Sequence, residues 1–439
     1  MKKRFISLLL VFSIVLILIP VKGFAAPGDV SNFAEFKAAL EDPNVIYINL
    51  TNSFSMGTNP VIINANKSSL VVNGNGFTIS QIATVFSTYS IQLDTSRTNI
   101  SSVTFQNMSI TGAGQRGFMQ IPSGAKNSAF SVNFDFINFN GQELIQAKYS
   151  DVTIANSNIV VQVGNDDNIK YLAEGLNITL GGLLKITKPN PVSYRTLFYI
   201  NQQGSLTIAP GAHVDIQNNT LDARVSKKAG FAFFAASTTK LTFGENCWFY
   251  YEGINAFMYG YAVGDVVVKN GADVTILISG TIASSDGLLG VNSSMTILPY
   301  ASFIIAAVNN TNAWPVIRFS HTATFTVDAP LYVLIYNRTQ TPLMPSQYGL
   351  AISGPLTMTI HYDNVTEVGY YINNTAPYYA LLTPTLSFTN DGGLFSTILS
   401  MSGGKVYTIY PLTYNGLTPL SSANLRDVNV ISISGITET

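Results

Sequence analysis

Residues Asp265–Gly280 read DVVVKNGADVTILISG. Val266 and Val268 lie two residues apart before the turn at Asn270–Gly271, and Val274, Ile276 and Ile278 have the same spacing after it. Alternation with a period of two predicts a strand with one buried face. Asn and Gly adopt positive φ at low cost, so they permit a tight bend between two such strands. The stretch is therefore a strand–turn–strand unit.

This unit recurs along the chain, which predicts a repeat protein. Its first apolar residue lies at positions 178, 206, 241, 266, 295 and 325, a drifting period of about 30 residues. No long helical pattern intervenes, which excludes βαβ units. A β-sandwich or barrel, the alternative, would place strands about 8–12 residues apart without a longer period. We therefore predict an all-β fold, a right-handed single-stranded parallel β-helix, whose hand follows from the preference of parallel crossovers.

In such a solenoid, equivalent inward residues of successive coils stack in columns. We expect one inner column to contain Val152, Ile178, Leu206, Leu241, Val266, Met295 and Phe325. We expect a second to contain Ile159, Leu184, Val214, Trp248, Val274 and Phe303. We expect Cys247 to be buried in the core. Because it is the only cysteine in the sequence, the chain can form no intrachain disulfide.

The N-terminus has the three parts of a secretory signal peptide. Basic residues Lys2–Arg4 precede an apolar run from Phe5 to Pro20 and a small-residue cleavage site at Ala25 or Ala26. We expect three segments: 1–26 signal peptide, 27–388 parallel β-helix with an N-terminal cap, and 389–439 β-rich C-terminal coils or cap. No later stretch is long and apolar enough to span a membrane, so the mature chain is expected outside the cell or at the cell wall, without a membrane span.

Charge and composition narrow the possible partners. Only 11% of the residues are charged, against about 25% in an average protein. Without the signal peptide, acidic residues outnumber basic ones. The chain is thus no polycation, which argues against a nucleic-acid partner.

A short helix is expected at the start of the mature chain. Phe33, Phe36 and Leu40 lie at i, i+3 and i+7, which predicts one apolar helix face. Asp29 or Ser31 could cap this helix. Because the open end of a stacked core must be covered, a lone helix before many strands fits a solenoid cap.

The opening DVSNFAEFKAAL at 29–40, followed by VIYINL at 45–50, resembles the start of the pectate-lyase-like adhesive domain of Gram-positive surface and secreted proteins. The turn LTIAPGA at 206–212 also resembles such domains, and the resemblance extends over residues 28–340. It implies a capping helix that runs into a β-helix, and adhesion rather than catalysis. Wall-attachment signals are common in that family, and this sequence shows none.

The same fold resembles pectate lyases and polygalacturonases, so the alternative function is a polysaccharide lyase or glycoside hydrolase acting on uronic-acid polymers. A lyase of this kind needs acidic side chains that hold Ca²⁺ and a basic residue that abstracts a proton. A hydrolase needs a pair of acidic side chains. The adjacent acids Asp166 and Asp167, with Lys170 nearby, are candidate binding residues; a solvated loop is the other interpretation. The spacing of acids and histidines assigns no catalytic residue, metal ligand or cofactor.

Aromatic residues offer a second candidate site in the stretch CWFYYEGINAFMYGY, residues 247–261. Exposed rings can stack on sugars, and we select Tyr251, Tyr259 and Tyr261. The alternative is that Trp248, Tyr250 and Phe257 simply fill the coils. The sequence predicts a non-catalytic protein that binds extracellular polysaccharide, cell wall or a host surface; a structural wall-associated rod is the third possibility.

Overall fold

A computed structural model gives the arrangement of residues 28–436. Within this range it does not describe residues 58, 65, 82–88, 95–98, 113–116, 123–129, 163–170, 190–196, 219–232, 236–237, 255–256, 261–262, 281–286, 309–315, 320–322, 329, 338–349, 353–355, 362–366, 374–384, 390–394, 401–405 and 413–429. The predicted signal peptide, residues 1–26, lies outside the described residues.

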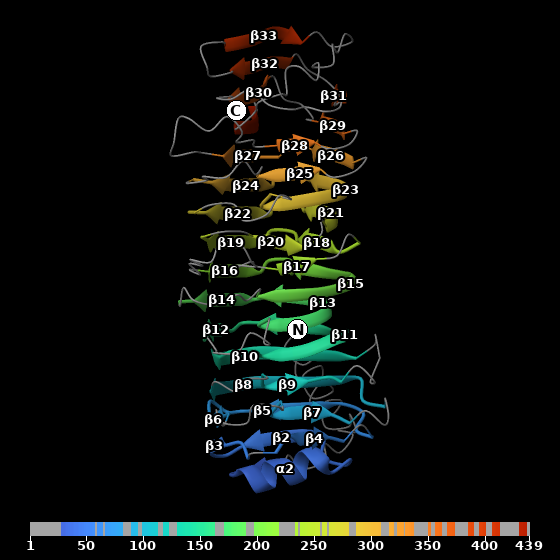
Figure 1. The fold of residues 1–439 in the computed structure, drawn as a ribbon, viewed down its shortest axis with the longest axis vertical. Coiled ribbons are helices and arrows are strands. Elements are labelled where there is room, and N and C mark those ends of the chain that lie inside the picture. The colour runs from blue at the N-terminus through green and yellow to red at the C-terminus, as the bar shows by residue number, and fades with distance from the viewer. Residues whose placement is uncertain are drawn as a thin grey trace, which may run out of the picture.

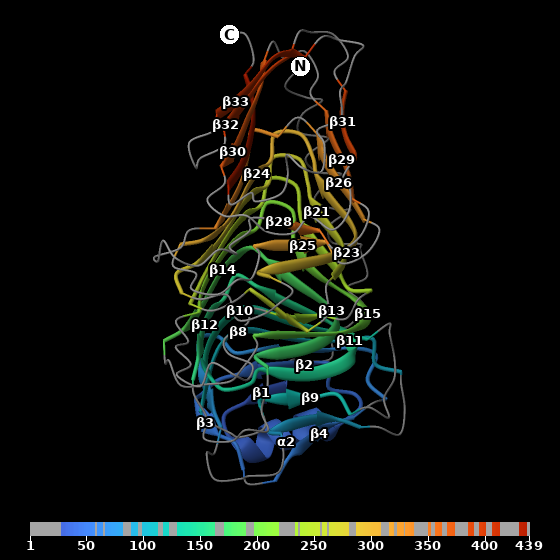
Figure 2. The same ribbon diagram turned by 45° about the horizontal axis from the view of Figure 1, so that its top comes forward.

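The described chain is an elongated stack of coils with helix α2 (Phe33–Glu41) at one end (Figures 1 and 2). Its strands form a 32-stranded sheet and a separate two-stranded one. Strand pairings from β1 (Gly28–Val30) to β31 (Thr385–Thr389) are parallel, except those that involve β34 (Val430–Ile436). This parallel β-solenoid with an N-terminal helix confirms the predicted fold class.

Successive coils stack their strands in three ladders, which are numbered in the order in which the chain visits them from β4 onward. Ladder 1 contains β4 (Val61–Ile63), β7 (Ile91–Leu93), β9 (Met119–Gln120), the first parts of β11 (Ile145–Ala155), β13 (Ala173–Gly181) and β15 (Phe198–Ile208), then β17 (Phe233–Ala235) and β20 (Met258–Gly260). On the same side follow the start of β23 (Leu289–Ile297), β25 (Ile317–Phe319) and β28 (Leu350–Ile352).

Ladder 2 runs from the first coil to the last parallel strand. It contains β1, β2 (Tyr47–Leu50), β5 (Leu70–Asn73), the first parts of β8 (Ser102–Gly112) and β10 (Ser131–Gly141), the ends of β11, β13 and β15, then β18 (Lys240–Phe243), β21 (Val263–Val268), the end of β23, β26 (Ala323–Asp328), β29 (Leu356–His361) and β31.

Ladder 3 forms the remaining side and carries the candidate site described below. It contains β3 (Phe54–Ser55), β6 (Thr78–Ser80), the ends of β8 and β10, then β12 (Asn158–Val161), β14 (Leu183–Lys188), β16 (His213–Asn218), β19 (Trp248–Gly253), β22 (Asp273–Ile278), β24 (Ser302–Ala307) and β27 (Tyr332–Asn337).

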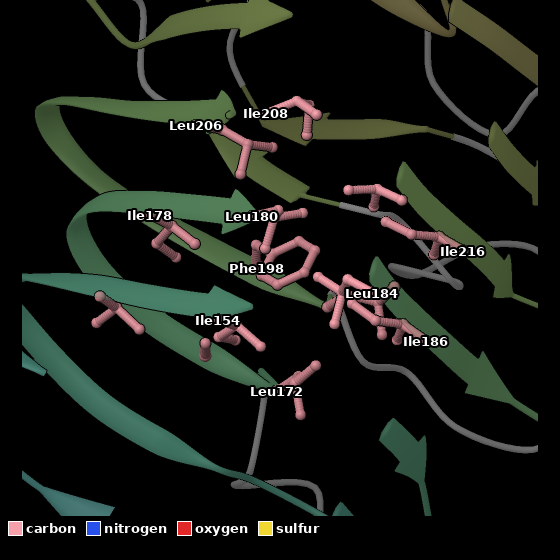
Figure 3. Close-up of a cluster of buried hydrophobic side chains, with 14 of the residues drawn as sticks. Ile154, Leu172, Ile178, Leu180, Leu184, Ile186, Phe198, Leu206, Ile208 and Ile216 are labelled. Atoms are coloured by element: carbon pink, nitrogen blue, oxygen red, sulfur yellow. The ribbon is translucent and has the colours of Figure 1, made fainter. Parts of the chain in front are cut away.

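Inward residues of the three ladders form one continuous apolar core, part of which is drawn in Figure 3. The first predicted column is confirmed: each member is buried and pairs in register with the next. The column runs Val152, Ile178, Leu206, Leu241, Val266, Met295 and Phe325. Each strand thus buries alternate side chains against the coil before and the coil after it.

The second predicted column is wrong at two places. Phe249, not Trp248, pairs with Val214 and Val274 and is buried. Ile159 pairs with Ile186 rather than Leu184, because the turns between ladders 2 and 3 differ in length in this part of the chain. The remaining members, Leu184, Val214, Val274 and Phe303, are buried as predicted. Leu184 pairs in register with Val214, and Val274 with Phe303.

A repeated turn decides which residues face inward on ladder 3. It places a left-handed residue directly before a small buried one. The left-handed residues are Gly211, Asn246, Gly271 and Tyr300, with φ of 66°, 53°, 66° and 61°. The small buried residues are Ala212, Cys247, Ala272 and Ala301. The residue after each small one points outward and the next points inward, so this turn sets the phase of β16, β19, β22 and β24.

Helix α2 covers the first coil, as predicted. Its N-cap is Asn32, whose side chain accepts a hydrogen bond from the Glu35 backbone at 3.1 Å, rather than the predicted Asp29 or Ser31. The Glu35 carboxylate in turn accepts hydrogen bonds from the backbone N–H of Ser31 at 2.7 Å and its hydroxyl at 2.9 Å. This reciprocal arrangement resembles a capping box.

At the other end, parallel stacking gives way to antiparallel pairing. Strand β34 pairs antiparallel with β27 and with β30 (Glu367–Asn373). Strands β32 (Phe395–Ser400) and β33 (Val406–Leu412) form an antiparallel pair. The predicted boundary between residues 388 and 389 falls inside β31, and the division of the chain there stays a prediction.

Candidate functional site

The residues selected from sequence fall in different environments. Tyr251 lies inside the core, is 0% exposed, and its hydroxyl accepts a hydrogen bond from the Asn218 side chain at 3.2 Å. Its ring therefore cannot stack on a ligand, and the structure corrects its selection as a binding residue. Tyr261, Asp166 and Asp167 lie outside the described residues. Tyr259 lies on β20 and only its backbone is described, so Tyr259, Tyr261, Asp166 and Asp167 stay predictions.

The same aromatic stretch nevertheless places rings on the outside of ladder 3. Trp248 and Tyr250 are partly exposed on β19, and His213 is exposed on β16. The His213 and Trp248 rings have centroids 4.0 Å apart and planes 12° apart. The Trp248 and Tyr250 rings have centroids 5.9 Å apart and planes 11° apart. We call these three nearly parallel rings the ring set.

Strand register explains why the rings gather. His213 and Trp248 are direct partners on neighbouring parallel strands, so their rings stack along the axis of the solenoid. Trp248 and Tyr250 are two residues apart on one strand and therefore share a face. The rings thus stand on a rigid sheet rather than on a loop.

Hydrogen-bonding groups surround the rings. The Tyr250 hydroxyl donates to Oε2 of Glu252 at 3.0 Å, and Nε2 of Gln217 donates to Oδ2 of Asp215 at 3.3 Å. Partial burial, the hydrogen bond to Glu252 and the charges of Glu252 and Asp215 raise the pKa of Tyr250. The other carboxylate oxygen of Asp215, Oδ1, is enclosed and accepts no hydrogen bond. A carboxylate oxygen in that state favours an added donor.

The next coil presents short side chains beside the rings. Asp273 is the register partner of Trp248, and Thr275 is the partner of Tyr250. Ser302 follows Asp273 one coil further along. Aromatic rings on one coil thus adjoin hydroxyl and carboxylate groups on the next two. This combination can offer an apolar surface and polar partners to one ligand.

A second polar column, on ladder 1, is more enclosed. Gln120, Gln146, Glu174 and Tyr199 occupy successive register positions. Oε1 of Gln146 accepts from Nε2 of Gln120 at 2.7 Å and from the Tyr89 hydroxyl at 2.9 Å. Glu174 is 6% exposed, and this burial raises its pKa, opposed by its hydrogen bond with Gln146. The enclosure and internal bonding of the column favour a role in holding adjacent coils together.

The described residues form neither a metal-binding cluster nor a membrane-spanning helix. Within these residues, no three or more His, Cys, Asp or Glu side chains gather in a way that could hold a metal ion. The helix described here is neither long nor apolar enough to cross a membrane.

Sequence reasoning selected the stretch that carries two of these rings, but it assigned Trp248 to the core and did not select Tyr250 or His213. A usable signal was present. Aligning Asn246-Cys247 with Gly271-Ala272 places Trp248 at the position of Asp273, which is plainly an outward residue. That alignment would have reversed the assignment of Trp248 and Tyr251.

Comparison with known proteins supports the predicted resemblance. Residues 28–161 match the family model described as "Putative pectate lyase-like adhesive domain". This is a shorter stretch than the predicted 28–340; it includes α2 and ends with β12, before the ring set. A solved structure titled "L. reuters 100-23 SRRP" is similar at 14% identity, with a TM-score of 0.49, covering 74% of this chain and 98% of that chain. No curated protein sequence matches.

Proposed function

We propose that this protein is a secreted or cell-surface adhesive protein that binds an extracellular glycan without catalysing its cleavage. The observation that carries the proposal is the ring set, in which the partly exposed rings of Trp248 and Tyr250 lie in nearly parallel planes beside hydroxyl and carboxylate groups. Glycan sites commonly combine an aromatic surface with a few polar groups that fix orientation. The adhesive description of the matched family supports the same function.

The scaffold favours such binding for a physical reason. Parallel pairing on both sides holds the β19 backbone, and His213 packs against one face of Trp248. The Tyr250 hydroxyl is tied to Glu252. Side chains that are already ordered lose little conformational entropy on binding. A stack of coils is also suited to adhesion because it can present a site away from the surface that bears it.

The test compares binding by the wild-type chain and the double variant Trp248→Ala, Tyr250→Ala. Binding to an array of immobilised polysaccharides and to isolated cell walls would be measured by biolayer interferometry. Base stacking on aromatic rings suggests about 1–3 kcal/mol for each ring, so the double variant should bind at least about tenfold more weakly. The control is Phe136→Ala, which removes an exposed ring (57% exposed) at a corner between ladders 2 and 3.

Two results would contradict the proposal. Unchanged binding by the double variant would remove the ring set from the function. Release of unsaturated or reducing-end products from uronic-acid polymers, abolished by changing Asp166 and Asp167 to Ala, would establish the lyase or hydrolase alternative instead.

A further inference from the structure

The charges around the ring set indicate which glycan it selects. The outward charged side chains of β16, β19 and β22 are Asp215, Glu252 and Asp273, which are all acidic, besides the imidazole of His213. The two residues of β24 that are not buried, Ser302 and Ile304, carry no charge. On the other side, β14 contributes one outward cation, Lys185, in register with Asp215. Carboxylates therefore dominate the electrostatic field at the rings.

These carboxylates disfavour an acidic ligand. A uronate unit stacked on Trp248 would bring its own carboxylate near Asp273, the register partner of Trp248, and near Glu252 on the same strand. Like charges at such positions repel each other, and the repulsion is greater at partly buried sites than in water. The arrangement argues against the uronic-acid polymers that pectate lyases and galacturonases bind.

The same groups attract a cation. The faces of Trp and Tyr rings carry negative electrostatic potential and bind ammonium groups. The carboxylates of Glu252, partly exposed on β19, and of Asp273, exposed on β22, are suitable acceptors for an ammonium N–H. Ring faces and acceptors thus lie together on two adjacent strands, β19 and β22.

We infer that the ring set binds a polysaccharide with free amino groups, such as a deacetylated glucosamine polymer, in which sugar units stack on Trp248 and Tyr250 and the ammonium groups of neighbouring units lie near Glu252, Asp273 and Asp215. This inference rests on the proposed function and names its ligand class. It requires a preference for the amine over the N-acetylated sugar, because acetylation removes the positive charge and retains the sugar ring.

The experiment uses the full mature chain and three probes of matched length: a deacetylated glucosamine oligomer, its fully N-acetylated form, and oligogalacturonate. Binding is measured by isothermal titration calorimetry at pH 6 and physiological salt. An exposed cation–π contact alone raises affinity by about two- to fivefold. Because the carboxylates add to this attraction, the wild type should bind the deacetylated oligomer about tenfold more tightly than the N-acetylated one. Glu252→Gln and Asp273→Asn should each reduce that preference by about threefold.

The control variant is Glu41→Gln, which changes the net charge equally but lies on α2 at the far end of the solenoid. If Glu41→Gln lowers amine binding as much as Glu252→Gln does, the attraction is non-specific and the inference is wrong. Equal affinity for the amine and the N-acetylated oligomer would overturn the inference and leave the proposed function standing. Binding to none of the immobilised polysaccharides in the array would overturn both.

Discussion

Replacing Lys67 with Met should loosen the N-terminal cap of the solenoid. Lys67 is 0% exposed, and its ammonium donates hydrogen bonds to the carbonyls of Ala39 at 3.1 Å, Val45 at 2.5 Å, and Asp42. An ammonium has three N–H groups, so all of them are used. Ala39 lies in the last turn of α2 and Asp42 is its C-cap. One side chain thus holds the end of the helix against the first coil.

The expected loss follows from these contacts. A hydrogen bond contributes about 1 kcal/mol net, and a buried acceptor left without a donor costs at least that much. Three carbonyls lose their donor in Lys67→Met, while methionine fills most of the space, so the cap should lose about 3 kcal/mol. Hydrogen exchange of the α2 amides would then accelerate by about a hundredfold. Mass spectrometry of exchange at pH 7 measures this directly.

The matched control is Lys37→Met on the same helix. Lys37 pairs with Glu41 at 2.6 Å, but the two side chains are 45% and 43% exposed, and an exposed pair contributes at most about 0.5 kcal/mol. Its variant should therefore exchange within about threefold of wild type. If Lys67→Met exchanged no faster than Lys37→Met, the three carbonyl bonds would not hold the cap and the reasoning would be refuted.

Raising the pH gives a second check on Lys67. Burial lowers its pKa to about 8 in the folded protein, against about 10.4 in an unfolded chain. Between these values the unfolded state binds more protons than the folded state, so stability rises with pH across this window. Wild-type α2 should become more protected from pH 8 to 10, after correction for intrinsic exchange. Lys67→Met should lack this gain.

The remaining predictions concern the core and one strained corner. Phe249→Ala should destabilise the solenoid by about 3–5 kcal/mol, whereas Trp248→Ala should cost less than about 1 kcal/mol; equal losses in urea unfolding would contradict the assigned phase of β19. Phe136 has a left-handed backbone with φ of 51°, and Asn107 holds the equivalent position on the coil before. Phe136→Asn should therefore stabilise the folded protein by about 1 kcal/mol. A lower midpoint of urea unfolding would contradict this. Cys247 is 1% exposed and burial raises the pKa of its thiol to about 11; it should react with a thiol reagent at pH 8 only after unfolding, and rapid native labelling would refute its burial.

The parts of the fold predicted correctly share one property: their alternation has a single solution. In Ile178–Leu180 and Leu206–Ile208, a threonine separates the two apolar residues, so only one parity buries the apolar set. The register of the first column followed from this. The helix could be predicted for the same reason, because Phe33, Phe36 and Leu40 all lie on one helix face.

In the aromatic stretch, the residues that face inward could not be predicted in this way. Residues 247–251, CWFYY, are apolar or aromatic at both parities, so hydrophobicity alone cannot choose between Trp248 and Phe249. The left-handed Asn246 and the buried Cys247 fix where the strand begins, and this determines that Phe249 points inward and Trp248 outward. The parallel planes of His213 and Trp248 depend on contacts between coils 35 residues apart in sequence, which no local pattern encodes.

The central claim, that Trp248 is an outward residue that contacts the glycan, is tested most directly by its fluorescence. Trp248 and Trp314 are the only tryptophans, so Trp314→Phe makes Trp248 the single reporter. On titration with the deacetylated glucosamine oligomer, the account predicts a shift of the Trp248 emission to shorter wavelength and reduced quenching by acrylamide, with the midpoint equal to the calorimetric affinity. Calorimetric binding with unchanged Trp248 emission and quenching would place the glycan elsewhere and contradict the claim.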